Sequence, residues 1–255
     1  MKIEELFSLR GKTAVITGAS KGIGKELAGL MAAAGANVAL VARDEAQLNT
    51  VAEDLSLEKN RIAVFPFDLL NTNKIPKLID DILAVFGSID ILLNNAGINL
   101  PKPPEDVTEQ DWDMMLDLNL KSVFFLSKEA GKHMKVQGSG KIINMSSQMA
   151  QVGYFGRTPY CASKGGITQL TKALAIEWAS SQINVNAIAP TFIETPMTEN
   201  MFKDKEFHEQ ILNRIPLGRL AKIEDLYGAA LFLSSDSSSM VTGQTIYVDG
   251  GWTVW

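Results

Sequence analysis

The sequence predicts an α/β protein: a single doubly wound domain in which a seven-stranded parallel sheet carries helices on both faces. Short apolar runs alternate along the chain with longer stretches whose apolar residues recur at helical spacing. The short runs are apolar throughout rather than at every second position, which is typical of strands buried on both faces of a parallel sheet. The 255 residues contain no linker, repeat or low-complexity segment, so we expect residues 1–255 to form one domain.

The strand signals are short, apolar and mostly rich in β-branched residues, and a helical stretch or a turn follows each of them. The seven expected strands are Thr13–Thr17, Asn37–Ala42, Ile62–Pro66, Ile89–Leu93, Lys141–Met145, Val185–Ile188 and Thr245–Val248.

The helix signals lie between these strands and are bounded by capping residues or glycine. Gly35 ends the first helix, and the Asp44 side chain can cap the second. The expected helices are Gly24–Ala34, Asp44–Leu57, Lys74–Phe86, Glu109–Val136, Thr158–Ser180 and Ile223–Ser234. The remaining stretch, Pro190–Pro216, is long for an irregular connection, so we expect a substrate-binding loop at about 190–216; a mobile surface insertion is the alternative.

Composition excludes several classes of protein. The chain has 24 Lys and Arg against 29 Asp and Glu, a net charge of −5, whereas nucleic-acid binding needs a basic surface. Its one cysteine, Cys161, excludes an internal disulfide and fits a reducing compartment. Two histidines, His133 and His208, cannot form a multi-histidine zinc site with that cysteine, and we expect no metal.

No segment has the pattern of a targeting or membrane-spanning sequence. Met1–Lys12 is charged and lacks an apolar core, unlike a signal peptide. The longest apolar stretch without charge, Leu27–Ala42, is shorter than the roughly 20 residues that span a bilayer, and Gly35 interrupts it. We therefore expect a soluble, cytoplasmic protein.

A glycine-rich turn connects the first strand to the first helix. In Thr17–Gly24, Gly18, Gly22 and Gly24 permit a tight turn and a close approach of the backbone to a pyrophosphate, which the helix N-terminus would bind. The segment is not a Walker A loop, because Glu26 stands where Ser or Thr should follow the lysine. The pattern favours a Rossmann-type dinucleotide site; a glycine turn kept for packing is the alternative.

The end of the second strand indicates which dinucleotide is bound. An acidic residue there would bind the 2′-hydroxyl of the NAD ribose, whereas a basic one would bind the 2′-phosphate of NADP. Ala42 occupies the usual acidic position, Arg43 follows it, and Lys21 supplies a second cation. The pattern favours NADP(H). The alternative is that Arg43 is solvated and Asp44 binds the ribose of NAD(H).

Three residues suggest acid–base chemistry. Tyr160 and Lys164 are four apart, which places them on one face of a helix. A neighbouring lysine cation stabilises a phenolate, so we expect Lys164 to lower the pKa of Tyr160 from its ordinary value near 10. Ser147 ends the fifth strand at the carboxyl edge of the sheet, where open α/β folds bind ligands, and its hydroxyl can hold a substrate oxygen.

With these motifs the chain resembles the short-chain dehydrogenase/reductase family over nearly its whole length. Several separate segments match family motifs in the right order: Thr17–Gly24 (TGxxxGIG), Asp68 (the acid at the adenine), Asn94–Gly97 (NNAG), Asn119, Ser147 with Tyr160 and Lys164, and Asp249–Gly251. The resemblance implies a homotetramer, paired through the long helices and the last strand.

The resemblance also implies a role for each catalytic residue. Tyr160 would protonate the carbonyl oxygen, and Lys164 would bind the nicotinamide ribose. Ser147 would orient the substrate oxygen, and Asn119 would hold a water that relays the proton. The implied cofactor-binding residues are Gly18, Ser20, Lys21, Gly22, Ile23, Gly24, Arg43, Asp68, Leu69, Asn95, Ala96, Gly97, Tyr160, Lys164, Pro190, Ile193 and Thr195.

One position departs from the family pattern. Thr191 follows Pro190 where a glycine is usual, and its Cβ restricts a backbone that normally has the freedom of glycine. This change could shift the nicotinamide end of the loop, so Thr195 either contacts the carboxamide of the cofactor or caps a helix.

The segments Phe7–Lys12 and Asp249–Trp255 are most similar to family members that act on sugar acids and polyols, such as gluconate 5-dehydrogenase-like enzymes. We therefore expect a small-molecule alcohol or carbonyl substrate. The expected substrate residues are Ser147, Gln148, Met149, Gly153, Tyr154 and Phe192, with Trp252 as a further candidate. Arg157 either meets a substrate carboxylate or has a structural role. Met149 and Phe192 could instead be core residues, and Cys161 is expected to be a small buried thiol.

Two alternatives remain for the function. The first is 3-oxoacyl-[acyl-carrier-protein] reductase, whose members use arginines to dock an acidic carrier; Gly138 and Ser181 occupy the matching positions here. Lys132, Lys135 and Lys141 could compensate for those arginines. The second is a cofactor-binding sensor without turnover, which the presence of Tyr160 and Lys164 argues against. A serine hydrolase is disfavoured because no GxSxG turn surrounds Ser147.

Overall fold

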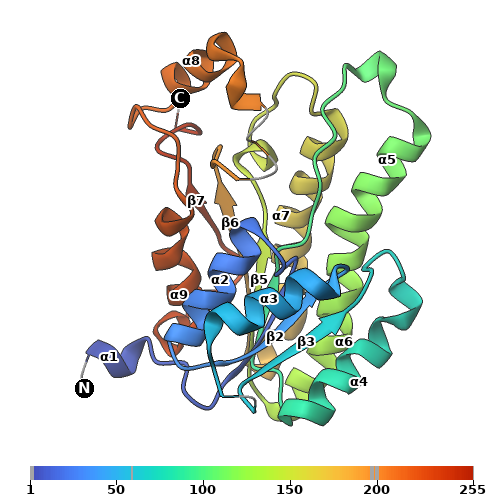
Figure 1. Cartoon of the computed structure of the whole chain (residues 1–255), viewed down its shortest axis with the longest axis vertical. Coiled ribbons are helices and arrows are strands. Elements are labelled where there is room, and N and C mark those ends of the chain that lie inside the picture. Colours follow the sequence, from blue (N-terminus) through green and yellow to red (C-terminus); the bar gives the residue numbers. More distant parts are fainter. Residues whose placement is uncertain (1–2, 59, 196–197, 199–200, 255) are drawn as a thin grey trace.

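Seven parallel strands form one sheet in the computed structural model, which describes residues 3–58, 60–195, 198 and 201–254 (Figure 1). The strands are β1 (Thr13–Thr17), β2 (Asn37–Ala42), β3 (Ile62–Pro66), β4 (Ile91–Asn94), β5 (Gly140–Met145), β6 (Ile183–Pro190) and β7 (Thr245–Val248). Their order in the sheet is β3-β2-β1-β4-β5-β6-β7, so the direction of winding reverses between β1 and β4. This order confirms the doubly wound fold, which binds ligands at such a reversal.

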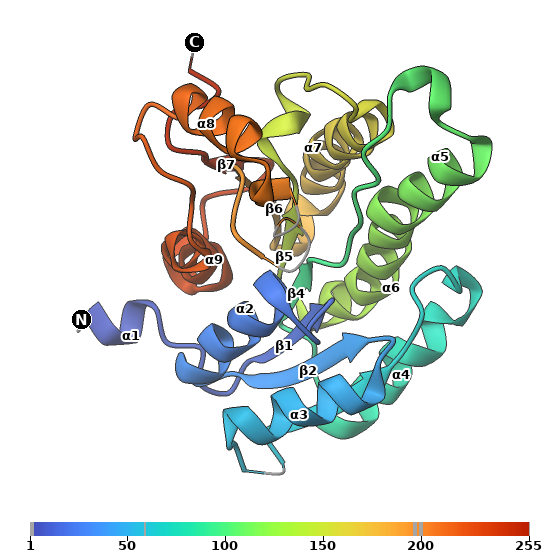
Figure 2. The same cartoon turned by 45° about the horizontal axis from the view of Figure 1, so that its top comes forward.

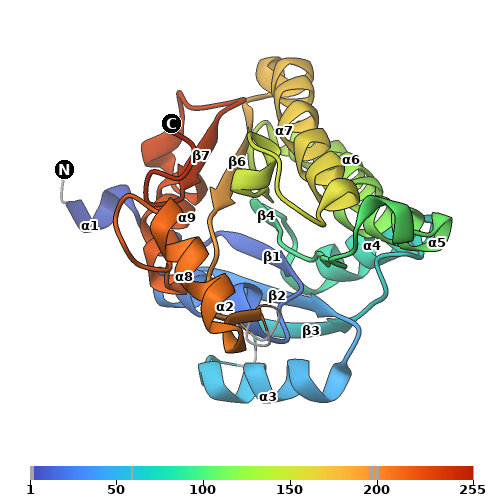
Figure 3. The ribbon, with the colours of Figure 1, turned by 90° about the horizontal axis from the view of Figure 1, so that it is seen from above.

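The described helices are α1 (Ile3–Leu6), α2 (Gly22–Ala33), α3 (Glu45–Leu55), α4 (Ile75–Phe86), α5 (Glu109–Leu116), α6 (Ser122–Gln137), α7 (Thr158–Trp178), α8 (Lys205–Arg214) and α9 (Tyr227–Ser234). Helices α2, α3 and α9 cover one face of the sheet, and α4, α6 and α7 cover the other (Figure 3). Along β1 all five residues are buried: Ile16 packs in the first layer and Val15 in the second. The apolar runs therefore mark strands buried on both faces, as predicted.

The segment 190–216 is less irregular than the sequence suggested. It contains α8, whose amino end is capped by Asp204: the carboxylate accepts hydrogen bonds from the Glu206 and Phe207 amides. The prediction missed α8 because most of its residues are polar and only one of them, Ile211, is fully buried, so the helix has few apolar positions to signal it. In Figure 2, α8 lies on the β6–β7 side of the molecule and α5 on the opposite side.

The expected helix Glu109–Val136 is divided in two. Helix α5 begins at a capping box formed by Thr108 and Asp111, and α6 begins at Ser122. Between them, Asp117–Lys121 form a π-helical turn that buries Asn119, which is 1% exposed. Such turns are rare and are often found at functional sites. Periodicity could not reveal it, because one turn of different pitch shifts the apolar face only slightly.

No helix among the described residues combines the length and apolar character that a membrane crossing requires.

The carboxyl ends of β1 and β4 are held together by one side chain. The Thr17 Oγ1 atom accepts hydrogen bonds from the Asn95 and Ala96 amides at 3.0 and 3.1 Å and donates to the Leu93 carbonyl at 3.3 Å. Thr17 is 1% exposed, so these amides have no solvent to replace it. This bond network sets the separation of the two strands at the point where the sheet reverses.

Replacing Thr17 by Val should lower the free energy of unfolding by about 1–3 kcal/mol, because two amides in a region closed to solvent lose their acceptor while the side-chain shape is kept. Urea unfolding measures the change. The matched control is Thr245→Val on β7, since the Thr245 hydroxyl has no hydrogen-bond partner among the described residues. Equal stabilities of the two variants would contradict the bracing role of Thr17.

Candidate functional site

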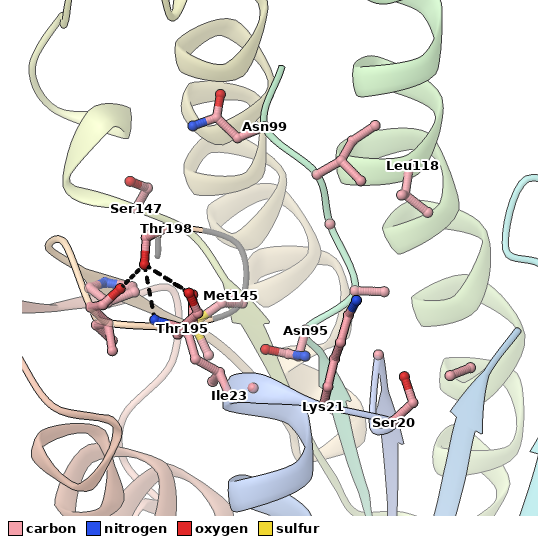
Figure 4. Close-up of a pocket in the computed structure, with 18 of the residues that line it drawn as sticks. Ser20, Lys21, Ile23, Asn95, Asn99, Leu118, Met145, Ser147, Thr195 and Thr198 are labelled. Atoms are coloured by element: carbon pink, nitrogen blue, oxygen red, sulfur yellow. Dashed lines mark hydrogen bonds between the residues drawn. The ribbon is translucent and has the colours of Figure 1, made fainter. Parts of the chain in front are cut away.

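A cavity of about 570 Å³ lies at the carboxyl ends of the strands. Residues that follow six successive strands of the sheet line it: Gly18 after β1, Arg43 after β2, Phe67 after β3, Asn95 after β4, Ser147 after β5 and Thr191 after β6. Figure 4 shows the walls meeting around this space, with Lys21 and Ser20 at one end and Ser147 and Asn99 at the other. The topology alone therefore brings residues far apart in sequence to one site.

The cavity collects most of the site residues that the sequence predicted. Those that line it are Gly18, Ser20, Lys21, Gly22, Ile23, Arg43, Asp68, Leu69, Asn95, Ala96, Gly97, Ser147, Gln148, Met149, Tyr160, Lys164, Pro190, Phe192, Ile193 and Thr195. Four predicted residues do not line it: Gly24, Asn119, Gly153 and Tyr154. Gly24 and Asn119 lie behind the cavity wall, and Gly153 and Tyr154 lie beside it.

Gly24 lies behind the cavity and sets how closely α2 approaches the sheet. A Cβ atom at this position would stand 2.2 Å from the Gly18 carbonyl oxygen and 2.6 Å from Asn95 Nδ2. Helix α2 begins at Gly22, and the side chain of Lys21 at the N-cap makes no capping hydrogen bond. The first amides of α2 are therefore available to an anion, as the glycine-rich turn predicted.

Two cations stand beside this anion site. Lys21 and Arg43 line the cavity, are exposed, and have side chains without an ion pair or hydrogen bond to another described residue. Asp44, the alternative ribose ligand, is already engaged: its two carboxylate oxygens accept from the backbone and side-chain nitrogens of Gln47 at 3.0 and 2.8 Å. The arrangement fits a phosphate at the end of β2 better than a ribose hydroxyl.

Ser147 and Tyr160 meet in the cavity. Ser147 Oγ accepts a hydrogen bond from the Met149 amide at 3.2 Å, so its proton remains available to another acceptor. Burial raises the pKa of Tyr160, whereas a hydrogen bond from Ser147 and the charge of Arg157 lower it. Burial outweighs the other groups, so the pKa of Tyr160 lies above its ordinary value of 10, whereas the sequence predicted a pKa lowered by Lys164.

Lys164 lines the cavity, and its ammonium group is fixed to the end of β5. Its Nζ atom donates a 2.7 Å hydrogen bond to the carbonyl of Met145, the last residue of β5, and lies 5.6 Å from the centre of the Tyr160 ring. The side chain is 5% exposed, and burial lowers its pKa from 10.5 to about 8. The distance from the phenol and the engagement with Met145 explain why the two side chains do not form a close charged pair here.

Asn119 lies outside the cavity wall and braces it. Its Oδ1 atom accepts from the Ile98 amide at 2.8 Å, and its Nδ2 atom donates to the Ile98 carbonyl at 2.8 Å and to Ser163 Oγ at 3.2 Å. These bonds connect the segment after β4 to α7. Both amide hydrogens are therefore in use, so a water at this residue would donate to the remaining acceptor sites of its side-chain or main-chain oxygen.

Gly153 and Tyr154 lie apart from the cavity lining. Tyr154 packs edge-to-face on Phe192 at 5.7 Å and on Trp252 at 5.9 Å, and only Phe192 of these three rings lines the cavity. Gly153 is exposed, and a Cβ built on it would meet no atom within 4 Å. These two residues support or adjoin the substrate side rather than face it.

Two further candidates, the basic residue Arg157 and the thiol Cys161, also lie outside the cavity lining. Arg157 is 6% exposed, and its Nη1 atom donates to the Gly156 carbonyl at 3.2 Å, which favours the structural interpretation. Cys161 is a free, half-buried thiol packed against the cluster of Met149, Phe192 and Trp252.

Several lining residues were missed from the sequence. None of them was among the predicted site residues, although some were noted for another reason. They are Ala42, Asp44, Gln47, Phe67, Leu70, Ile98, Asn99, Leu118, Met145, Ser146, Thr191 and Thr198. Most of them directly follow a strand or a predicted motif. The rule that parallel strands present their carboxyl ends to ligands could have found Phe67 and Ile98, whereas Leu118 comes from the unpredicted π-helical turn.

Comparison with known proteins finds relatives of this chain over nearly its whole length. The family model described as enoyl-(acyl carrier protein) reductase matches residues 18–253. Gluconate 5-dehydrogenase from Gluconobacter oxydans is 39% identical over 257 residues, covering 100% of this chain and 99% of that protein. 2-Dehydro-3-deoxy-D-gluconate 5-dehydrogenase from Escherichia coli is 42% identical over 247 residues, covering 96% and 97%. A 3-oxoacyl-[acyl-carrier-protein] reductase from Thermotoga maritima is 39% identical over 243 residues, covering 95% and 98%.

Solved structures are similar over the same extent. The crystal structure of a gluconate 5-dehydrogenase from Burkholderia cenocepacia in complex with NADP and tartrate has a TM-score of 0.96 and 36% identity, covering 100% of both chains. A putative NAD(P)-dependent gluconate 5-dehydrogenase from Beutenbergia cavernae with bound NADP has a TM-score of 0.93 and 38% identity, covering 98% of this chain and 100% of that one.

The lowered pKa of Lys164 should make stability depend on pH. The folded protein releases this proton near pH 8 and the unfolded chain near 10.5, so the burial penalty is complete below pH 8 and disappears as pH rises towards 10.5. Relative to Lys164→Met, wild-type protein should gain about 2 kcal/mol in the free energy of unfolding between pH 7.5 and 9.5.

Urea unfolding of both proteins at the two pH values measures this difference. Lys25→Met is the control, because its hydrogen bond to Asp54 raises the pKa of Lys25 and no such gain should occur. A wild-type-minus-variant difference that is the same at both pH values would show that Lys164 keeps an ordinary pKa.

Proposed function

Since the chain belongs to the short-chain dehydrogenase/reductase family, we propose that it interconverts a secondary alcohol and a ketone on a small polar substrate, a sugar acid, polyol or similar carbonyl compound. It is an NAD(P)-dependent oxidoreductase that acts on CH–OH groups. The observation that carries the proposal is that Ser147, Tyr160 and Lys164 line the same cavity as the glycine turn. Lys21 and Arg43, which have no ion-pair partner among the described residues, also line it. The sugar-acid class is supported by the full-length relatives named above.

NADP(H) is the cofactor that the donor set fits. The cradle of Gly18, Gly22 and the α2 amides would hold its pyrophosphate, and Asp68 and Leu69 would lie at its adenine. Lys21 and Arg43 would bind its 2′-phosphate, since Asp44 is engaged as a helix cap. Asn95, Ala96, Gly97, Pro190, Ile193 and Thr195 would line its nicotinamide half. When bound, this cofactor supplies or accepts the hydride at the reacting carbon.

The chain's own residues handle the proton and the oxygen. Tyr160 would donate its phenolic proton to the carbonyl oxygen in reduction and accept it back in oxidation. Ser147 would donate a hydrogen bond to the same oxygen, because the Met149 amide fixes the hydroxyl by donating to its oxygen. Lys164 would bind the nicotinamide ribose from its place over Met145, and Asn119 would hold the Gly97–Ile98 segment in place.

Reduction of an acyl group on a carrier protein is the second candidate, because a relative 39% identical over 243 residues has that name. An acidic carrier needs free cations. Lys132 pairs with Glu129 at 2.6 Å, Lys135 lies over the Trp178 ring at 5.5 Å, and half-buried Lys141 donates to Asn184. The lysines that could replace the missing arginines are therefore engaged, which favours the small-molecule substrate.

The proposal also covers the domain, its oligomeric state and its partners. We propose one cytoplasmic domain over residues 1–255 that assembles as a homotetramer and binds neither nucleic acid nor membrane. An apolar groove lies between α5, the π-helical turn, α6 and α7, and it is suited to the helix pairing that the family resemblance implies; Leu116, Leu120, Phe124 and Leu170 line it.

A substrate panel followed through NADPH absorbance tests the function. Wild-type protein should reduce 5-keto-gluconate and simple ketoses with a higher kcat/KM than an acetoacetyl thioester. Tyr160→Phe should lower turnover by about 10²–10⁴-fold, because the general acid is lost, and should leave NADPH binding unchanged. A thioester as the best substrate would favour the carrier-protein reductase, and retained turnover in the Phe variant would overturn the role of Tyr160.

Arg43→Ala should weaken NADPH binding by roughly 10–100-fold, because a charge-assisted hydrogen bond to the phosphate is lost, and should change NADH binding little. Fluorescence titration of both cofactors measures the two dissociation constants. Arg10→Ala is the matched control, since Arg10 is exposed and lies outside the cavity lining. Equal losses for NADPH and NADH would refute the contact between Arg43 and the 2′-phosphate.

A further inference from the structure

Three residues of the cavity wall, Asn99, Gln148 and Thr191, carry a buried side-chain oxygen without a hydrogen-bond partner among the described residues, and the last two follow neighbouring strands. Gln148 Oε1 and Thr191 Oγ1 are closed to solvent and have no hydrogen-bond partner among the described residues. Gln148 is 1% exposed and Thr191 is 8% exposed. Buried polar groups in folded proteins are nearly always hydrogen-bonded, and leaving one unpaired costs about 1–3 kcal/mol. A polar group of a bound molecule could therefore supply the hydrogen bonds that these two oxygens lack among the described residues.

Gln148 and Thr191 follow neighbouring strands of the sheet. Strands β5 and β6 are paired as far as Met145 opposite Ile188; Thr191 directly follows β6, and Gln148 begins the short 3-10 turn Gln148–Ala150, which contacts β6. The Ser146 amide donates to the Ile188 carbonyl at 2.8 Å and the Thr191 amide donates to the Val248 carbonyl at 3.1 Å, so both backbones are fixed beyond the last ladder pair. Both residues thus line the cavity where two neighbouring strands end.

This edge adjoins the oxygen-binding serine. Ser147 directly precedes Gln148, and neighbouring parallel strands lie about 4.8 Å apart. A group bound between Gln148 and Thr191 is therefore close to an oxygen held by Ser147. Vicinal oxygen atoms of a polyhydroxylated compound are carried by adjacent carbons, so they are the pair of substrate oxygens that adjacent residues such as Ser147 and Gln148 can bind.

The chemistry of the pair fits a hydroxyl group. Gln148 Oε1 accepts a hydrogen bond, and Thr191 Oγ1 can donate one, so a single hydroxyl can donate to the first and accept from the second. Both oxygens are covered in this structure. Rotation about one side-chain torsion exchanges the hydroxyl of a threonine with its methyl group, so Thr191 can present its oxygen to the cavity without backbone movement.

We propose that Thr191, together with Gln148, binds a hydroxyl group on the carbon next to the reacting carbonyl and selects α-hydroxy ketones and the corresponding vicinal diols. The inference rests on the proposed function and deepens it. It assigns a role to the one position at which the sequence departs from the expected glycine, since glycine could supply neither the hydroxyl nor its orientation.

The test compares acetoin with butan-2-one, which lacks only the neighbouring hydroxyl, as substrates for reduction by NADPH. The measured quantity is the ratio of kcat/KM for acetoin to kcat/KM for butan-2-one. Thr191→Val should lower this ratio about tenfold, because it removes the hydroxyl and keeps the side-chain shape. Thr191→Ser should restore most of the ratio. Thr245→Val, which removes another buried unpartnered hydroxyl far outside the lining, should leave it unchanged.

Three other results would overturn the inference, and each has a different consequence for the proposed function. A wild-type ratio near one shows that no hydroxyl is recognised, while the proposed oxidoreductase function stands. A loss that is equal for both substrates, or a weaker dissociation constant for NADPH in Thr191→Val, assigns the hydroxyl to the cofactor instead. Wild-type protein that reduces neither of these ketones nor 5-keto-gluconate refutes the proposed function, and the inference falls with it.

Discussion

The close approach of α2 to the ends of β1 and β4 is the constraint on which the rest of the site depends. No side chain fits at Gly24, because a Cβ would overlap the Gly18 carbonyl oxygen at 2.2 Å. Asn95 occupies the same contact, and its Nδ2 atom donates to the Thr17 carbonyl at 3.0 Å. The helix terminus, the glycine turn and the segment after β4 are thus fixed relative to one another. The proposed phosphate site and the proposed wall of the nicotinamide half therefore depend on one packing contact.

A second network holds the acid–base residues, and it passes through main-chain atoms. Lys164 is anchored to the Met145 carbonyl, and Asn119 makes both of its short bonds to the backbone of Ile98. Deeper in the sheet, Asn94 donates to Asn144 at 2.9 Å, and Asn144 donates to Thr171 on α7 at 2.9 Å. Polar side chains buried between β4, β5 and α7 therefore fix the helix that carries Tyr160 and Lys164, since leaving any of them unpaired would be costly.

Local sequence rules predicted the parts of the fold that depend on local signals. The strands Thr13–Thr17, Asn37–Ala42, Ile62–Pro66 and Thr245–Val248 have the predicted bounds, and Asp44 caps α3 as expected. The π-helical turn at Asp117–Lys121 was missed because it hardly changes the apolar face of the helix around it. Helix α8 was missed because only one of its residues is fully buried. Likewise, the four-residue spacing of Tyr160 and Lys164 placed them on one face, but it could not show that Lys164 is turned to a strand carbonyl.

The substrate side of the cavity is the part that motifs describe least, because it is built by contacts between distant segments. Phe192 lines the cavity and packs on Tyr154 at 5.7 Å, on Trp252 at 5.6 Å and on Phe207 of α8 at 6.0 Å. Arg214, at the end of α8, lies over the Trp252 ring at 5.3 Å and the Tyr154 ring at 5.8 Å. Three segments must therefore fold together before Phe192 has its position. The cofactor half follows from local turns and strand ends, whereas the substrate half follows from this aromatic packing. Changes in α8 or at the carboxyl end can accordingly reshape the substrate half while the glycine cradle stays intact.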